Sequence, residues 1–149
     1  MPGWSRRGCR RPERGRGKSL RREYLDQSEW GIAMVAFLLL ALIAVVHLYI
    51  LVIEMLLWET PRVRRIFGTT AEFAAATKAM AGNQGLYNGF LAAGLFWGLS
   101  LGAAGASVKV FFLLCVLVAG LYGAATASRK ILFIQAIPAA IGLALVLMA

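Results

Sequence analysis

Two polar side chains, His47 and Glu54, interrupt an otherwise apolar stretch of the sequence and are its first candidates for chemistry. They are seven residues apart, about two helical turns and a rise of roughly 10 Å, so they share one face of a helix. Trp58 continues the same row at the end of the stretch. An ionisable group in lipid is expected to be neutral, paired or close to the headgroups. Glu54 is therefore expected either in an intramembrane pocket or in contact with Arg62 or Arg64 at the membrane surface.

A second group of polar side chains opens the segment NQGLYNGFLAAGLFWGL, residues 83–99. Asn83 and Tyr87 are four residues apart, as are Gln84 and Asn88, so all four lie on one side of a helix. Such groups are costly to bury in lipid unless they are hydrogen-bonded. Three interpretations stay open: hydrogen bonds between helices, a ligand pocket shared with His47 and Glu54, and an exposed cluster at the membrane surface.

Each candidate ligand-binding residue carries a polar group inside an apolar segment. The group is either uncharged or a weak acid or base. These residues are His47, Glu54, Trp58, Asn83, Gln84, Tyr87, Asn88 and Gln135. The sequence pairs no nucleophile with a base and has no phosphate-binding loop, so catalytic residues stay unassigned and enzymatic activity stays open. With one histidine and two cysteines outside any metal-ligand spacing, no metal and no cofactor are expected.

The composition places these residues in a membrane protein. Of 149 residues, 60% are hydrophobic and 15% are charged, and the mean hydropathy is +0.71. These values lie outside the usual range of soluble domains. The net charge of +9 does not indicate nucleic-acid binding, because nine of the sixteen Lys and Arg residues precede residue 23. The lipid bilayer is the expected partner, and the inner (plasma) membrane is the expected location.

Four uncharged runs predict an all-α membrane protein, a bundle of four transmembrane helices. The expected spans are residues 31–57, 83–103, 108–127 and 131–149, within a domain of residues 30–149. A short interfacial helix is expected between the first two spans. It should begin near Thr70, because Thr69 and Glu72 have the spacing of a capping box, and it should either lie at the interface or run on into the second span. Pro61 should end or redirect the first span.

Residues 1–29 form a different kind of sequence, rich in Arg and Gly and without apolar periodicity, and they predict a disordered tail. Three interpretations stay open: a polybasic arm at anionic headgroups, a solvated tail without a role, and translation from an upstream start, with Met34 as the alternative start.

Glycines at spacing four suggest close helix packing. Gly94 and Gly98 follow the polar side of the second span, and Gly85 and Gly89 repeat the spacing on a different face. These glycine faces predict contact with neighbouring helices or a homodimer.

Three segments of the chain resemble one family of small bacterial membrane proteins, catalogued as domain of unknown function 1304. They are HLYILVIEMLLWETPRVRRIFG, NQGLYNGFLAAGLFWGL and VAGLYGAATASRKILFIQAIPA. The resemblance covers about residues 32–147 and implies a four-helix membrane protein with no assigned activity. All eight candidate residues match the family pattern, as do Thr60, Pro61, Gly85 and Gly89.

Three functions therefore compete at the level of sequence. The first is a bundle with an intramembrane pocket for a small or lipophilic ligand. The second is an accessory protein that packs in a larger membrane complex, and the third is a small proton-coupled transporter acting as a dimer. Most basic residues outside the tail lie in the first and third loops, which predicts that both termini lie outside the cytoplasm. The nine basic residues of the tail, if they are translated, favour the opposite orientation.

Overall fold

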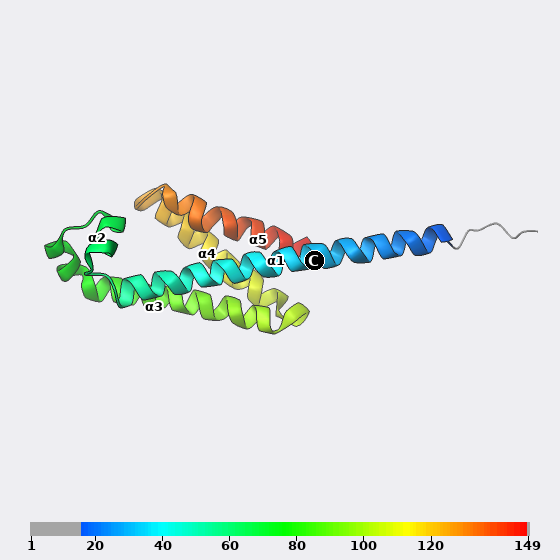
Figure 1. Cartoon of the computed structure of the whole chain (residues 1–149), viewed down its shortest axis with the longest axis horizontal. Coiled ribbons are helices and arrows are strands. Elements are labelled where there is room, and N and C mark those ends of the chain that lie inside the picture. Colours follow the sequence, from blue (N-terminus) through cyan, green and yellow to red (C-terminus); the bar gives the residue numbers. More distant parts are fainter. Residues whose placement is uncertain (1–15, 149) are drawn as a thin grey trace, which may run out of the picture.

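The structure, a computed structural model, describes residues 16–148 and is entirely helical over that range. Figure 1 shows four long helical segments arranged side by side, with a short helix, α2, across one end. The α-helices are α1 (Arg16–Met55), α2 (Pro61–Phe67), α3 (Ala71–Ser100), α4 (Ala106–Thr126) and α5 (Ile137–Met148). A 3-10 turn, η1 (Gly102–Gly105), precedes α4, and a π-helical turn, η2 (Leu132–Ala136), precedes α5.

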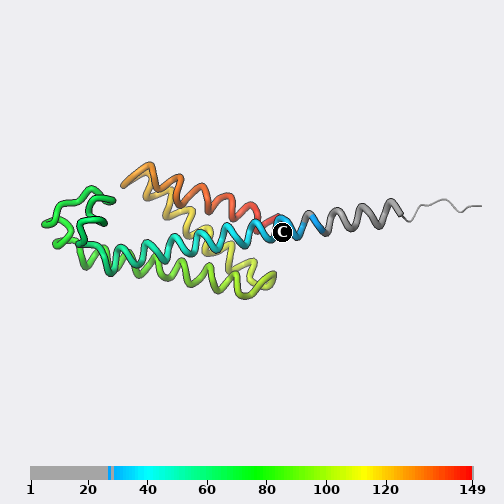
Figure 2. The backbone as a smooth tube through the Cα atoms, in the orientation of Figure 1, coloured from blue at the N-terminus to red at the C-terminus, as the bar shows by residue number. Residues whose placement is uncertain are grey.

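The helices form a closed ring in which α1 contacts α3 and α5, and α4 contacts the same two helices. Figure 2 shows the chain crossing the bundle back and forth, so that consecutive long helices run in opposite directions. The core gathers small and branched side chains from all four segments: Leu40, Ile43, Ala44, Leu95, Leu113, Val116 and Ala139. The all-helical fold class is confirmed.

Helix α1 is longer than the expected span of residues 31–57. It starts at Arg16 and ends at Met55, so it includes residues that the sequence analysis assigned to the tail. The segment from Lys18 to Glu29 contains good helix formers and no Gly or Pro, which favours continuation of the helix. Residues 1–15 of the expected tail lie outside the described residues.

Two threonines determine how the chain turns between α1 and α3. Thr60 caps α2 by accepting a hydrogen bond from Val63 N, with Pro61 in the first turn. Gly68 ends α2 with φ 68°, a left-handed conformation that favours glycine. Thr70 caps α3 through Oγ1, which accepts from Phe73 N at 3.2 Å.

The expected capping box at Thr69 is wrong by one residue. Thr69 N–H donates to Arg64 O at 2.9 Å, so Thr69 completes the end of α2 and Thr70 becomes the cap. The short helix between the first two long helices is α2, whereas the helix that begins after Thr70 continues unbroken to Ser100. Its start lies well before the expected boundary at residue 83, because the charged first turns are helical too.

Two described segments are long and apolar enough to cross a membrane, Glu29–Met55 and Gly102–Thr126. The apolar segment Leu132–Met148 is shorter. The loop between the third and fourth expected spans is a tight turn at residues 127–131, in which Ile131 N–H donates to Ser128 O at 3.0 Å.

Candidate functional site

His47 is buried between α1 and the start of α5, with 1% of its surface exposed. Its Nδ1 lies 2.8 Å from Ile43 O in the preceding turn. Its Nε2 lies 3.0 Å from Nε2 of Gln135. A neutral imidazole satisfies both contacts, because Nδ1–H then donates to the carbonyl and Nε2 accepts from the Gln135 amide. Both ring nitrogens of His47 are thus occupied within the chain.

The π-helical turn η2 brings Gln135 to this position. Pro138 has no N–H and its ring would clash with the carbonyl four residues earlier, so a regular α-helix is unfavourable here. The chain instead widens, and Ile137 N–H donates to Leu132 O, five residues back. Gly120 of α4 permits the close approach of this turn, since a Cβ there would lie 2.8 Å from Ala136 N.

Glu54 and Asn88 form a second polar contact, between α1 and α3. Asn88 Nδ2 donates to Glu54 Oε2 at 3.0 Å and also lies 3.1 Å from Gln84 O. Both side chains are half-buried. Gly85 makes this approach feasible, because a Cβ at that position would lie 3.1 Å from Glu54 Cβ. Of the alternatives expected for Glu54, pairing inside the bundle is the one that the structure shows, with Asn88 as the partner.

The two contacts lie at different depths along α1. His47 and Glu54 are two helical turns apart on α1, which corresponds to roughly 10 Å along the helix axis. His47 faces η2 through Gln135, whereas Glu54 faces α3 through Asn88. His47 and Glu54 therefore take part in the contacts of two different helix pairs.

The polar group at the start of residues 83–99 is divided by the fold. Asn83, Gln84 and Tyr87 are exposed, and the Tyr87 ring packs edge-on against Phe90 with centroids 6.1 Å apart. Asn88 alone of these four turns toward α1. The α1-facing side of α3 is instead marked by Gly85 and Gly89, which the backbone and side chain of Leu51 approach.

Trp58 connects the three segments that meet at the loop end of the bundle. Its indole Nε1–H donates to Thr77 Oγ1 of α3 at 3.1 Å. Its ring packs against Phe67 of α2, with centroids 4.9 Å apart and planes 59° apart. Trp58 therefore holds the end of α2 against the first turns of α3.

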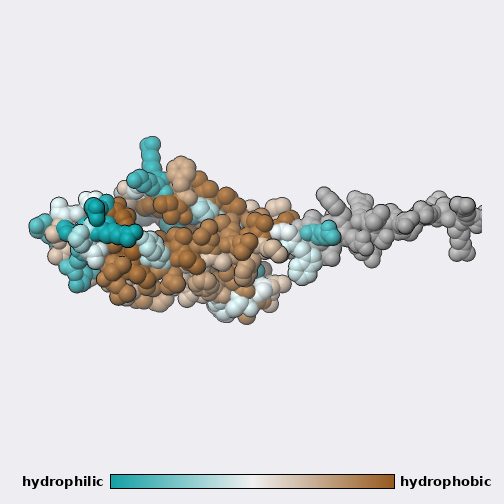
Figure 3. Space-filling view, in the orientation of Figure 1, coloured by the Kyte–Doolittle hydropathy of each residue, from teal (hydrophilic) through white to brown (hydrophobic). Residues whose placement is uncertain are grey.

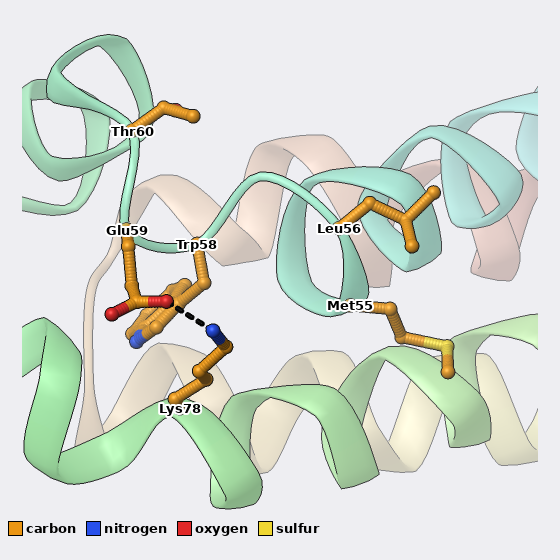
Figure 4. Close-up of a pocket in the computed structure, with 6 residues that line it drawn as sticks. All are labelled: Met55, Leu56, Trp58, Glu59, Thr60 and Lys78. Carbon is orange, nitrogen blue, oxygen red and sulfur yellow. Dashed lines mark ion pairs between the residues drawn. The ribbon is translucent and has the colours of Figure 1, made fainter.

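A pocket of about 220 Å³ lies beside Trp58 (Figure 4). Met55 and Leu56 contribute apolar surface, and Glu59 and Lys78 form an ion pair at its polar side. Of the eight candidate residues, Trp58 alone lines this pocket. The sequence analysis missed Glu59, Lys78 and Thr77, because ordinary charged and hydroxyl residues of a loop carry no signal of their partners.

Among residues 16–148, no three His, Cys, Asp or Glu side chains gather closely enough to bind a metal ion.

Replacing Asn88 with leucine is expected to lower the free energy of unfolding by about 1 kcal/mol, because Glu54 loses its amide donor in a half-buried position. Equilibrium unfolding in detergent measures the change. Asn83→Leu is the matched control and is expected to be neutral, since Asn83 is exposed. Equal losses for the two variants would contradict a role for the Glu54–Asn88 contact.

Comparison with known proteins gives one family and one relative. The family model described as "Protein of unknown function (DUF1304)" matches residues 41–147, which include all eight candidate residues. "Uncharacterized protein YpaA" of Lactococcus lactis subsp. lactis (strain IL1403) is 24% identical over 106 residues, which cover 70% of this chain and 89% of the relative. No solved structure matches. The family match spans most of the chain and agrees with the resemblance in the sequence, so this chain belongs to the DUF1304 family.

Proposed function

We propose that this chain is a multi-pass membrane protein in which the segments of α1, α3, α4 and α5 all cross the bilayer. The support is the outer surface of the bundle, which Figure 3 shows as a broad hydrophobic band with hydrophilic residues toward its ends. Exposed large apolar side chains occur on every long segment. They include Leu42, Val45, Phe90, Trp97, Phe111, Val118, Phe133 and Ile141. Exposed apolar surface of this extent favours lipid over water as the surroundings.

The orientation follows from the distribution of charge. The short helix α2 and the turn between α4 and α5 lie toward one end of the bundle (Figure 1). Among residues 30–148, that end carries Arg62, Arg64, Arg65, Lys78, Arg129 and Lys130, whereas Lys109 lies near η1 at the other end. The nine basic residues of segment 1–29 favour the opposite orientation, and the orientation proposed here is based on residues 30–148. Positive charge favours the cytoplasmic side. We place the α2 end in the cytoplasm and the carboxyl terminus outside it, in the plasma membrane.

Within this membrane protein, the polar side chains act in helix pairing, and the chain is an accessory, helix-packing protein rather than a transporter. The observation that carries this assignment is the closed contact of His47 with Ile43 O and Gln135, in which both ring nitrogens are engaged. A histidine used this way specifies which helices meet. The glycines Gly85, Gly94 and Gly120 likewise face α1, α4 and η2 of the same chain.

A thiol-labelling experiment tests the four crossings. In a chain with Cys9 and Cys115 replaced by serine, single cysteines are placed at Thr69, Ser107 and Ser128. A membrane-impermeant reagent is expected to label Ser107→Cys in intact cells, and the other two only after permeabilisation. The reason is that Ser107 lies at the start of α4, at the end where Lys109 is the basic residue among residues 30–148, and the other sites lie at the α2 end.

Two results of the labelling would overturn the proposal. Equal access to all three cysteines from one side would contradict four crossings. Labelling of Thr69→Cys and Ser128→Cys in intact cells, without Ser107→Cys, would reverse the orientation.

Proton flux into vesicles separates the accessory role from transport. Purified protein in vesicles with a pH gradient is expected to give no flux above that of protein-free vesicles. Flux that His47→Leu abolishes would overturn the accessory role, because it would require His47 to exchange protons with an aqueous path.

The pocket beside Trp58 favours a second candidate function, binding of a small amphiphilic ligand. An apolar wall of Met55 and Leu56 next to the Glu59–Lys78 ion pair suits a molecule with one apolar and one polar part. A co-purified small molecule seen by native mass spectrometry, and lost in Trp58→Ala but retained in Tyr87→Ala, would establish this function. Identical spectra for the three proteins would remove it.

A further inference from the structure

A second pocket, distinct from the one beside Trp58, lies between α2 and the start of α3. Its volume is about 450 Å³, and it is lined by Pro61, Arg64, Arg65, Gly68 and Thr69. Two guanidinium groups and a hydroxyl are all hydrogen-bond donors, and guanidinium pairs match the oxygen atoms of a phosphate. We refer to Arg64, Arg65, Gly68 and Thr69 as the α2 site.

Arg64 is the residue of the α2 site that most lacks a partner. Its Nε is shielded from solvent and has no hydrogen-bond acceptor among the described residues. A shielded donor without an acceptor costs free energy in the folded state. An anion that accepts a hydrogen bond from Nε offsets this cost. Arg65 is exposed and uses Nε for Pro61 O at 3.4 Å, which leaves its terminal nitrogens free to donate.

The backbone at the α2 site is shaped by Gly68 and the turn that follows. Gly68 has φ 68°, and a Cβ built there meets no atom within 4 Å, so the surface at this corner is open. Gly68 N–H and Thr69 N–H both donate to Arg64 O, which fixes the turn. The arginines and the Thr69 hydroxyl are thereby held on one rigid corner.

The charge around the α2 site is positive even though one carboxylate is close. Glu72 lies at the start of α3, where its own backbone N–H, the Thr70 hydroxyl and the Arg64 charge hold the pKa of the Glu72 carboxyl below its ordinary value. Glu72 is thus negative at neutral pH and is engaged with the cap of α3. Arg62, Arg64 and Arg65 outnumber it on α2.

Apolar side chains next to the α2 site indicate where the anion comes from. Ile66 and Phe67, on the same short helix, are 58% and 42% exposed. A helix that carries three arginines followed by two exposed apolar side chains suits the boundary between headgroups and acyl chains. If the long helices cross the bilayer as proposed above, α2 lies at this boundary on the cytoplasmic side.

We propose that the α2 site binds the phosphate of an anionic phospholipid headgroup, with Arg64 and Arg65 donating to the phosphate oxygens and Thr69 donating through its hydroxyl. The inference rests on the proposed membrane location and adds a lipid class and a set of recognising residues to it. Ile66 and Phe67 contact the upper part of the acyl chains of the same lipid.

The experiment uses the full chain in a neutral detergent and a soluble short-chain phosphatidylglycerol as the probe. Wild-type protein is expected to bind this probe at least about tenfold more tightly than short-chain phosphatidylcholine, because only the first carries net negative charge. The double variant Arg64→Gln/Arg65→Gln is expected to lose that preference. Titration calorimetry or native mass spectrometry measures the affinities.

A second pair of cationic residues provides the matched control. Arg129→Gln/Lys130→Gln removes the same charge toward the same end of the bundle but outside the α2 site, and it is expected to weaken binding by less than about threefold. Equal losses in the two double variants would overturn the proposal in favour of unspecific attraction. Equal affinity of the wild type for the two lipids would overturn it as well.

Two further measurements keep the result decisive. Competition by millimolar inorganic phosphate that removes all lipid binding would assign the site to free phosphate and overturn the headgroup source. Circular dichroism shows whether the double variant folds. If it does not, the single variants Arg65→Gln and Thr69→Ala, both at accessible positions, are tested instead, and each is expected to weaken phosphatidylglycerol binding severalfold. Unchanged binding in these variants would overturn the proposal. The cysteine-labelling result is independent of these affinities, so a failure of the membrane orientation is distinguishable from a failure of the α2 site.

Discussion

Replacing Gly120 with leucine is expected to lower the free energy of unfolding by about 3 kcal/mol or more. A Cβ at this position would lie 2.8 Å from Ala136 N and 3.0 Å from Ala136 Cα, so the obstacle is backbone and cannot rotate away. Relief requires α4 to separate from η2, which also disturbs the turn that positions Gln135. Leucine has a higher helix propensity than glycine, so the loss is expected in spite of a local gain. Equilibrium unfolding in detergent, followed by circular dichroism, measures it.

Gly82→Leu is the matched control, because a Cβ at Gly82 in α3 meets no atom within 4 Å. This variant is expected to be as stable as the wild type or slightly more stable. A loss at Gly82 as large as that at Gly120 would show that leucine itself, rather than the contact with η2, is responsible.

Replacing Gln135 with leucine is expected to lower the free energy of unfolding by about 1–3 kcal/mol, because Nε2 of the buried His47 loses its hydrogen-bond donor. His47→Leu is expected to destabilise the protein as well, since it removes the partner of Gln135. The double variant should lose less than the sum of the single losses, with a coupling free energy of about 0.6–1.7 kcal/mol, as for other hydrogen bonds between membrane helices. A thermodynamic cycle over the four proteins measures that coupling.

Gln84→Leu provides the control for this cycle, because Gln84 carries the same amide but is exposed. Gln84→Leu is expected to change the free energy of unfolding by less than about 0.5 kcal/mol. A coupling free energy of zero between His47 and Gln135 would contradict the assignment of this contact to helix pairing.

The helical fold and the loop positions were predictable from the sequence, since charge-free runs, Pro61 and a threonine cap are local signals. The start of α3 was left open, since the helix expected near Thr70 was either a separate interfacial helix or the beginning of the second span, and the structure shows the second alternative. Charges before residue 83 limited the expected span, but the helix depends on backbone hydrogen bonds and its cap, so it begins at Ala71 regardless of where lipid contact begins. Because a helix depends on its backbone hydrogen bonds and its cap rather than on lipid contact, α2 was not anticipated as a separate helix either.

Asn88 contacts Glu54 of the first long helix, whereas Asn83, Gln84 and Tyr87, which were grouped with Asn88 on spacing alone, are exposed. Residues three and four apart share a side of a helix, but that side is wide, and the direction of a partner is set by where the backbones approach most closely. In α3 that line runs through Gly85, where a Cβ would lie 3.1 Å from Leu51 O.

The partner of His47 was beyond local signals for a different reason. Gln135 was recognised as a polar residue near Pro138, but its direction depends on the π-helical turn, which shifts all following side chains around the helix axis. Its contact with His47, 88 residues away in the chain, depends on the complete ring of helices.

The contact between His47 and Gln135 has a consequence for biosynthesis. It joins the first long helix to the last, and every residue between them must leave the ribosome before Gln135 can reach His47. If the long helices cross the bilayer as proposed, a chain that stops after α4 would leave Nε2 of His47 without its hydrogen-bond donor in the membrane, together with an uncovered side of α1. Such an incomplete product presents an unpaired polar group in lipid, a feature by which membrane proteases and insertion chaperones could distinguish it from the finished protein.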